Sequence, residues 1–272
     1  VLDKVGTYGM IRFCLELFPD ASRWATPAIT VLALVSIFYG AFMAIGERDL
    51  MRLISWTSVS HFGFIVLGIF AFTSVAQSGA NFYMVNHGFA TAGLFLVAGM
   101  LIARRGSQDI EAYGGWQRVT PVLAGVFLLS GLATLSLPGL STFVSEFLVI
   151  AGAWPREPVA TAFAVLGVVL AAIYVLLFYK RVFTGPPPVV GTAGTDAQEA
   201  TDEASELPFV RADLDEGRRP GVLAAAVPDL GWREKVVVAP ILVALVVLGF
   251  FPGPALDVIN PSVSPTVAEV AR

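Results

Sequence analysis

Four ionisable side chains stand in stretches of the sequence that are otherwise apolar: Lys4, His61, His87 and Glu146. Each lies in a different hydrophobic segment, so each would be carried by a different helix. A charge placed inside a membrane costs roughly 2.5–3.5 kcal/mol by insertion scales. Burial penalises the charged form of such groups, and imidazole titrates near neutral pH without help. If the segments cross a membrane, the four residues therefore indicate a chain of proton-exchanging sites joined by water.

Hydroxyl side chains accompany both histidines. Four hydroxyl residues lie one helical turn from a histidine: Thr57, Ser58, Tyr83 and Thr91. Residues three or four apart share a helix face, so each imidazole would lie in a polar stripe. The stripes favour a relay, but a buried histidine with a satisfied hydrogen bond is the alternative. Metal binding is disfavoured, because two histidines without cysteines or nearby carboxylates do not form a site.

A helix break precedes the acidic residue. Pro138 lacks a backbone donor and Gly139 has low helix propensity, so we expect the helix around them to break inside the membrane. Freed backbone groups there must be satisfied by protein or water, and broken helices often line ion paths. Glu146, two turns later, would then be the exit acid, which receives a proton from the His87 side and releases it outward. The alternatives are a simple proline kink beside a hydrogen-bonded Glu146, and a Lys4 that reaches to the membrane interface.

The composition is that of an integral membrane protein. The chain has 272 residues, of which 56% are hydrophobic and only 14% charged, whereas a soluble domain has about 25% charged residues. The formal net charge of −4 argues against a nucleic-acid partner. The single cysteine, Cys14, excludes a disulfide framework within the chain.

The elements that must position the four residues are long runs without charge. A membrane helix needs about 20 apolar residues, and helices satisfy their own backbone groups in lipid. We predict an all-α polytopic bundle of seven transmembrane spans with one broken helix. The predicted spans cover residues 1–18, 26–46, 50–72, 78–103, 119–153, 158–182 and 236–252.

Three regions follow from this layout. Residues 1–183 would form six transmembrane helices of a proton-translocating module, and residues 236–272 the last helix and an outer tail. Between them, residues 184–235 are rich in Gly, Ala, Pro and acidic side chains, which predicts a partly disordered linker. Residues 228–235 would approach the last span along the membrane surface.

Positive charge predicts the orientation. Most of the 17 lysine and arginine residues fall in the turns after the second, fourth and sixth spans, which places these turns in the cytoplasm and the C-terminal tail outside. The chain begins with Val1 and lacks the basic segment and cleavage site of a signal peptide. We therefore expect it to be the later part of a longer polytopic protein.

Four motifs resemble those of the antiporter-like membrane subunits of respiratory complex I, the NADH–quinone oxidoreductase. They are KVGTYGMIRF at 4–13, ISWTSVSHFGF at 54–64, NHG at 86–88 with GLF at 93–95, and LPG at 137–139 followed by EF at 146–147. Together they cover residues 4–147, and the similarity of layout extends to the tail at 257–261. The one departure is Met51, where the family often has a basic residue before Arg52.

The resemblance implies a fold and roles for the site residues. The family fold has fourteen membrane helices in two inverted repeats, each with a broken helix, and this chain would be its second half. Lys4 matches the central lysine of a hydrated axis, His61 and His87 its two histidines, and Glu146 its terminal acid. In the family's sister chains L and N, the position that matches Glu146 resembles a lysine instead, so Glu146 favours the chain M branch.

The resemblance also implies a function: proton translocation driven by quinone reduction elsewhere in the complex, across a bacterial plasma membrane. The chain would be part of an enzyme but would hold no redox centre. NADH, flavin, iron–sulfur clusters and quinone would lie in other subunits, and chains L and N and the lipid bilayer would be its partners. The alternatives are an Mrp-type Na⁺/H⁺ antiporter subunit, a membrane-bound hydrogenase subunit, and a purely structural membrane spacer.

Overall fold

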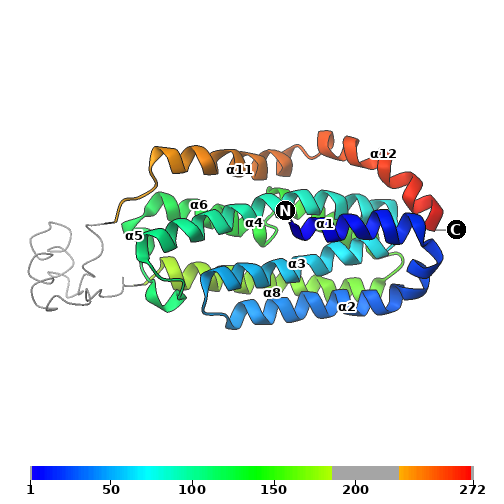
Figure 1. Cartoon of the computed structure of the whole chain (residues 1–272), viewed down its shortest axis with the longest axis horizontal. Helices are drawn as coiled ribbons and strands as arrows, with labels where there is room; N and C mark the ends of the chain where they lie inside the picture. The colour runs from blue at the N-terminus through cyan, green and yellow to red at the C-terminus, as the bar shows by residue number, and fades with distance from the viewer. Residues whose placement is uncertain (1, 186–226, 271–272) are drawn as a thin grey trace, which may run out of the picture.

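The protein is an elongated bundle of roughly parallel and antiparallel helices (Figure 1). The computed structural model describes residues 2–185 and 227–270, and regular structure in these ranges is helical. The helices are α1 (Leu2–Gly9), η1 (Met10–Leu15), α2 (Pro19–Gly46), α3 (Leu50–Phe70), α4 (Ser74–Arg105), η2 (Ile110–Ala112), α5 (Trp116–Val119), α6 (Pro121–Thr134), α7 (Ser141–Ala153), α8 (Pro158–Phe183), α11 (Trp232–Phe250) and α12 (Gly253–Val270). The predicted all-α membrane bundle is confirmed.

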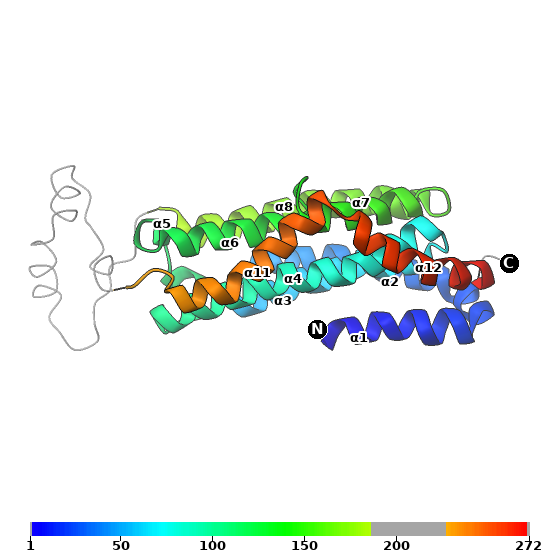
Figure 2. The same ribbon diagram turned by 90° about the horizontal axis from the view of Figure 1, so that it is seen from above.

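Helix lengths agree with most of the predicted spans. Four helices, α2, α3, α4 and α8, are each long and apolar enough to cross a membrane. The first span is helical from Leu2 to Leu17, close to the predicted 1–18, and the second begins earlier than predicted, at Pro19. Figure 2 shows α1 running along only part of the bundle.

The C-terminal region differs from the prediction. Helix α11 begins at Trp232, so the end of the predicted surface segment 228–235 is already its first turn. After Phe250 the chain continues as α12, bent by 73° from α11, where a tail was expected. The hydroxyl of Ser78 donates to Asn260 Oδ1 at 2.8 Å, which fastens α12 to α4. Most of the predicted linker 184–235 lies outside the described residues.

The predicted helix break is present. Helix α6 ends at Thr134 and α7 begins at Ser141. Between them Gly139 has φ +96° and Ser136 has φ +60°, so both have the positive φ that a helix does not allow. Glycine adopts positive φ without steric penalty. Two helices of 14 and 13 residues thus replace one continuous span, and the break lies within the length of the bundle (Figure 2).

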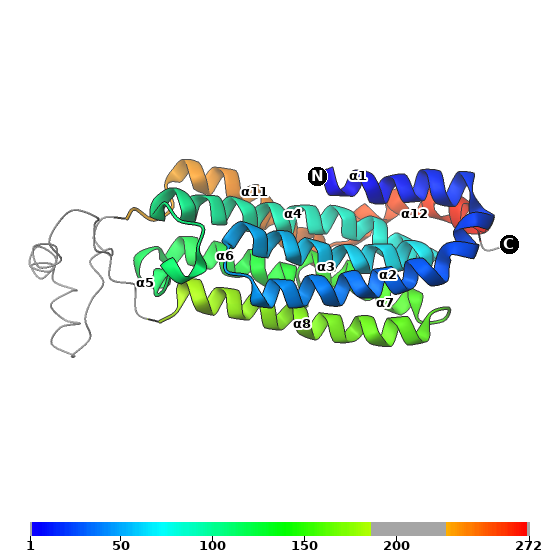
Figure 3. The same ribbon diagram turned by 60° about the horizontal axis from the view of Figure 1, so that its bottom comes forward.

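The turns that the charge pattern assigned to one side meet at one end of the bundle. The amide of Leu50 donates to Gln108 O at 2.8 Å, and that of Ile110 donates to Arg48 O at 2.7 Å. These bonds join the α2–α3 turn to the segment after α4. The amide of Gly115 donates to Thr184 O at 3.0 Å, which brings the end of α8 to the same place (Figure 3).

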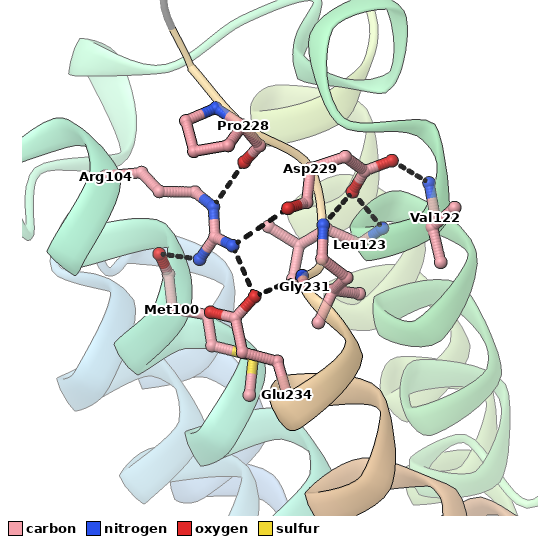
Figure 4. Close-up of polar contacts among 9 residues, drawn as sticks. Met100, Arg104, Val122, Leu123, Pro228, Asp229, Gly231 and Glu234 are labelled. Carbon is pink, nitrogen blue, oxygen red and sulfur yellow. Dashed lines mark hydrogen bonds and ion pairs between the residues drawn. The ribbon is translucent and has the colours of Figure 1, made fainter.

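A polar cluster at this end holds the start of α11 (Figure 4). Arg104, in the last turn of α4, is paired with Glu234 at 2.6 Å and donates from Nε to Pro228 O at 2.8 Å. Its side chain is only 10% exposed, so this pair is better protected from water than an ordinary surface pair. Arg104 therefore connects α4 to α11 and to the segment before it.

Asp229 binds the start of the broken helix. Its carboxylate accepts from the amides of Val122 at 2.8 Å and Leu123 at 3.1 Å (Figure 4). These amides are in the first turn of α6, whose own N-cap, Thr120, makes no side-chain capping bond. A carboxylate at a helix N-terminus satisfies open donors and interacts favourably with the helix dipole. Asp229 thus caps α6 from a distant part of the chain.

We predict that Asp229→Ala destabilises the protein by about 1 kcal/mol, the usual loss for a removed N-cap. Thermal unfolding of the full-length chain in detergent should show a lower midpoint. Asp257→Ala is the matched control, because Asp257 is an exposed carboxylate on α12. Equal midpoints for the two variants would contradict the capping role.

Candidate functional site

Three helices bring Lys4 and both histidines together. Lys4 Nζ on α1 is 2.7 Å from His87 Nδ1 on α4. The lysine ammonium also lies 5.0 Å from the centre of the Phe62 ring, a distance typical of a cation–π contact. The rings of His61, on α3, and His87 have centroids 5.1 Å apart. Lys4 is therefore directed into the bundle, which contradicts the alternative that it reaches for a membrane interface.

Tyr83 joins His61 to the acid. Its hydroxyl is 2.7 Å from His61 Nδ1 and donates to Glu146 Oε2 at 2.8 Å. Tyr83 and His87 are one turn apart on α4, so this helix contacts both ends of the chain of groups. The side chains run in the order Lys4, His87, His61, Tyr83 and Glu146, with a hydrogen bond at each step except between the two imidazoles.

The acid is buried beside the helix break. Glu146 lies in α7 and is 3% exposed. Its Oε2 atom accepts from the hydroxyls of Tyr83 and of Ser136, a residue of the break itself. Its Oε1 atom is buried and has no hydrogen-bond partner within residues 2–185 and 227–270. Glu146 also borders a cavity of about 440 Å³ whose walls come from the break, α7 and α8.

Close helix packing positions His61. A Cβ atom on Gly40 of α2 would lie 2.6 Å from the backbone nitrogen of Ser60 on α3. A Cβ on Gly63 would meet Ala33 O and the Ile37 side chain of α2. Glycine on each helix therefore allows α2 and α3 to approach closely on either side of His61. Any larger residue at these positions would displace α3, and the imidazole with it.

Asn86 fixes the acid-bearing helix to α4. Its Nδ2 atom donates to Ser141 O at 2.8 Å and to Ser145 Oγ at 3.4 Å. Ser141 is the first residue of α7, so this bond fixes the start of the acid-bearing helix to α4. Asn86 precedes His87 in the chain, and the same turn of α4 thus contacts the lysine side and the acid side of the site.

The structure brings all four predicted site residues together, but in a different arrangement from the one expected. Glu146 was expected to receive a proton from the side of His87, whereas the hydrogen bonds reach it from His61 through Tyr83. Tyr83 had been noticed only as part of a polar stripe. Tyr174 on α8, whose hydroxyl is 2.9 Å from His61 Nε2, was missed. A phenol in an otherwise apolar helix was the available signal.

Metal binding has no support in the described ranges, where no group of three or more His, Cys, Asp or Glu side chains could hold an ion. The fold and the site define a polytopic membrane protein with a buried row of ionisable and hydroxyl side chains. Residues 1–173 match the family described as "NADH:quinone oxidoreductase/Mrp antiporter, TM". The chain belongs to this family.

Curated relatives carry a more specific name. The NADH-quinone oxidoreductase subunit M of Mycobacterium tuberculosis (strain H37Rv) is 47% identical over 272 residues, which is 100% of this chain and 43% of that protein. The protein of the same name from Escherichia coli K12 is 34% identical over 257 residues, 94% of this chain and 44% of that protein. The chain therefore spans less than half of the length of these relatives.

Solved structures share the fold. A chain of respiratory complex I from Thermus thermophilus with bound NADH superposes with a TM-score of 0.81 at 29% identity, covering 99% of this chain and 50% of that one. A chain of the Mrp complex from Dietzia sp. DQ12-45-1b gives a TM-score of 0.78 at 23% identity, covering 98% of this chain and 52% of that one. The second likeness concerns the fold alone.

The position of Tyr83 generates a prediction that the sequence alone did not. Tyr83→Phe removes the hydroxyl between His61 and Glu146 and keeps the ring, so proton transfer along this row of side chains should slow by about tenfold or more. Tyr39→Phe is the matched control, because Tyr39 lies on α2 with its ring against Trp56. If both variants translocate protons at the wild-type rate, Tyr83 is not in the path.

Proposed function

We propose that this chain is the second half of a proton-translocating membrane-arm subunit of NADH–quinone oxidoreductase, in the chain M branch. The observation that carries the proposal is the buried row of side chains from Lys4 to Glu146, supplied by α1, α3, α4 and α7. Relatives named subunit M, at 47% and 34% identity, support the assignment to this complex.

In this proposal the row carries protons within the membrane. Lys4 delivers a proton to His87, the proton passes to His61, and Tyr83 transfers it on to Glu146. The two imidazoles are not hydrogen-bonded to each other, with ring centroids 5.1 Å apart, so one water or a ring movement completes that step. Glu146 releases the proton outward from the break at Pro138 and Gly139, where backbone groups are exposed.

The energy for transport comes from quinone reduction in other subunits. The chain is thus part of an enzyme, while NADH, flavin, iron–sulfur clusters and quinone bind elsewhere in the complex. Its partners are the neighbouring membrane-arm subunits, of the L and N type, and the lipid bilayer. We place it in a bacterial plasma membrane, with the end of the bundle that carries Arg104 facing the cytoplasm.

An Mrp-type cation/proton antiporter subunit is the second candidate, because the family description includes Mrp antiporters and the Dietzia chain has the same fold. The two candidates differ in what drives transport. Quinone-dependent proton uptake by membrane vesicles supports the first candidate, and Na⁺-dependent proton movement without quinone turnover supports the second.

Glu146→Gln tests the proposal. The amide keeps the size and hydrogen-bonding capacity of the side chain but cannot take up and release the proton, so pumping should fall by tenfold or more while the complex assembles. Reconstituted complex with a pH-sensitive dye measures the ratio of protons to electrons. Glu157→Gln, in the turn after α7, is the control and should pump normally. A Glu146→Gln complex that keeps the wild-type ratio would exclude Glu146 as the terminal acid.

The entry end of the row is tested at Lys4. Lys4→Ala should assemble and lose most of its coupled turnover, since His87 then loses the ammonium group that lies 2.7 Å from its Nδ1. Lys4→Arg should rescue poorly, because guanidinium does not release its proton in proteins. Lys180→Ala changes an exposed lysine at the end of α8 and serves as control. Near-normal pumping by both Lys4 variants would remove Lys4 from the path.

A further inference from the structure

Two tyrosine hydroxyls contact opposite nitrogens of the same buried imidazole. Tyr83 on α4 lies 2.7 Å from His61 Nδ1, and Tyr174 on α8 lies 2.9 Å from His61 Nε2. All three side chains are at most 1% exposed. A neutral imidazole has one donor and one acceptor nitrogen, so the two hydroxyls must play opposite parts, and counting protons decides which.

The count starts at the acid. An ionised carboxylate only accepts hydrogen bonds, so at 2.8 Å from Glu146 Oε2 the Tyr83 hydroxyl must be the donor. A phenol hydroxyl has a single hydrogen, and Tyr83 uses it in the hydrogen bond to Glu146. Toward His61 only the lone pairs of the Tyr83 oxygen remain. His61 Nδ1 must then carry the proton and donate it to Tyr83.

The role of Nε2 follows from that of Nδ1. With its proton on Nδ1, neutral His61 has a lone pair on Nε2 as its acceptor site. The hydroxyl of Tyr174 must donate to that atom. We propose that Tyr174 is a positioning residue that holds His61 in the Nδ1–H tautomer while Glu146 is ionised, and so directs the transferable proton of the ring toward Tyr83 and Glu146.

This inference rests on the proposed function for its significance, but not for its chemistry. In the Nε2–H tautomer the ring would have its proton on the side of α8, and the unprotonated Nδ1 would face the lone pairs of the Tyr83 oxygen. A proton could then not leave His61 toward Glu146 without a prior rearrangement. Tyr174 thus keeps Nε2 as the hydrogen-bond acceptor of His61 and leaves Nδ1 as the atom that carries the transferable proton.

The test reads the tautomer directly. The full-length chain, labelled with ¹³C and ¹⁵N in histidine only, is placed in lipid bilayers at alkaline pH, which favours the ionised carboxylate. Solid-state NMR distinguishes protonated from bare ring nitrogens, and the His61 signal is assigned by its loss in His61→Gln. We expect Nδ1 protonated and Nε2 bare in the wild type, and a measurably larger share of the Nε2–H form in Tyr174→Phe, where Tyr83 alone still favours the Nδ1–H form. A wild-type ring protonated at Nε2, or a Tyr174→Phe ring unchanged from wild type, would overturn the proposal.

A second measurement follows pumping in the assembled complex. Tyr174→Phe should slow it by roughly fivefold, the effect of one lost hydrogen bond, and 3-fluorotyrosine at position 174 should restore it because the donor is kept. Tyr179→Phe, one turn further along α8 with its ring against Phe183, should pump normally. Loss of pumping that 3-fluorotyrosine does not restore would contradict a role as hydrogen-bond donor. The NMR result is independent of pumping, so a wild-type ratio in Glu146→Gln would exclude the proposed path and leave the tautomer assignment standing.

Discussion

The burial of one carboxylate constrains the rest of the site. An ionised acid inside a bundle is costly unless donors surround it, and Glu146 has two hydroxyl donors on a single oxygen. One of them, Ser136, is available only because the helix is interrupted between α6 and α7. The other, Tyr83, ties the acid to α4 and from there to both histidines. The break is therefore part of the solvation of Glu146 as well as a local defect in a helix.

The same constraint explains why the ends of the broken helix are fixed elsewhere. A break leaves amides and carbonyls open, and each needs a partner when water is scarce. Asn86 bonds the first residue of α7 to α4, and Asp229 caps the open amides at the start of α6, the end away from the break. Arg104 then fixes the segment that carries Asp229. Side chains from distant parts of the sequence thus hold the two short helices in place.

Much of this arrangement could be predicted from the sequence. Charge-free runs marked the long helices, Pro138 and Gly139 marked the break, and Lys4, His61, His87 and Glu146 were evident as rare ionisable groups in apolar segments. Helix α12, which follows the bend after Phe250, was not predicted, because its sequence is less apolar than that of α11 and contains Pro261 and Pro265. Nor was the order of the side chains, since helix periodicity gives the face of a residue but not the neighbour opposite it.

Tyr174 shows where such reasoning ends. A tyrosine in a membrane helix is common, so the sequence does not mark Tyr174 as a site residue. Its role is evident only from the 2.9 Å distance to a histidine 113 positions earlier. Once that distance is known, the donors and acceptors of His61, Tyr83 and Glu146 can be assigned by counting protons. The donor-to-acceptor direction of the hydrogen bonds is then shared by all four side chains. If Glu146 became the donor to Tyr83, the hydrogen bonds at both nitrogens of His61 would also reverse. Protonation of the acid is therefore coupled to the state of His61 through two hydroxyl groups, and this coupling requires no movement of a helix.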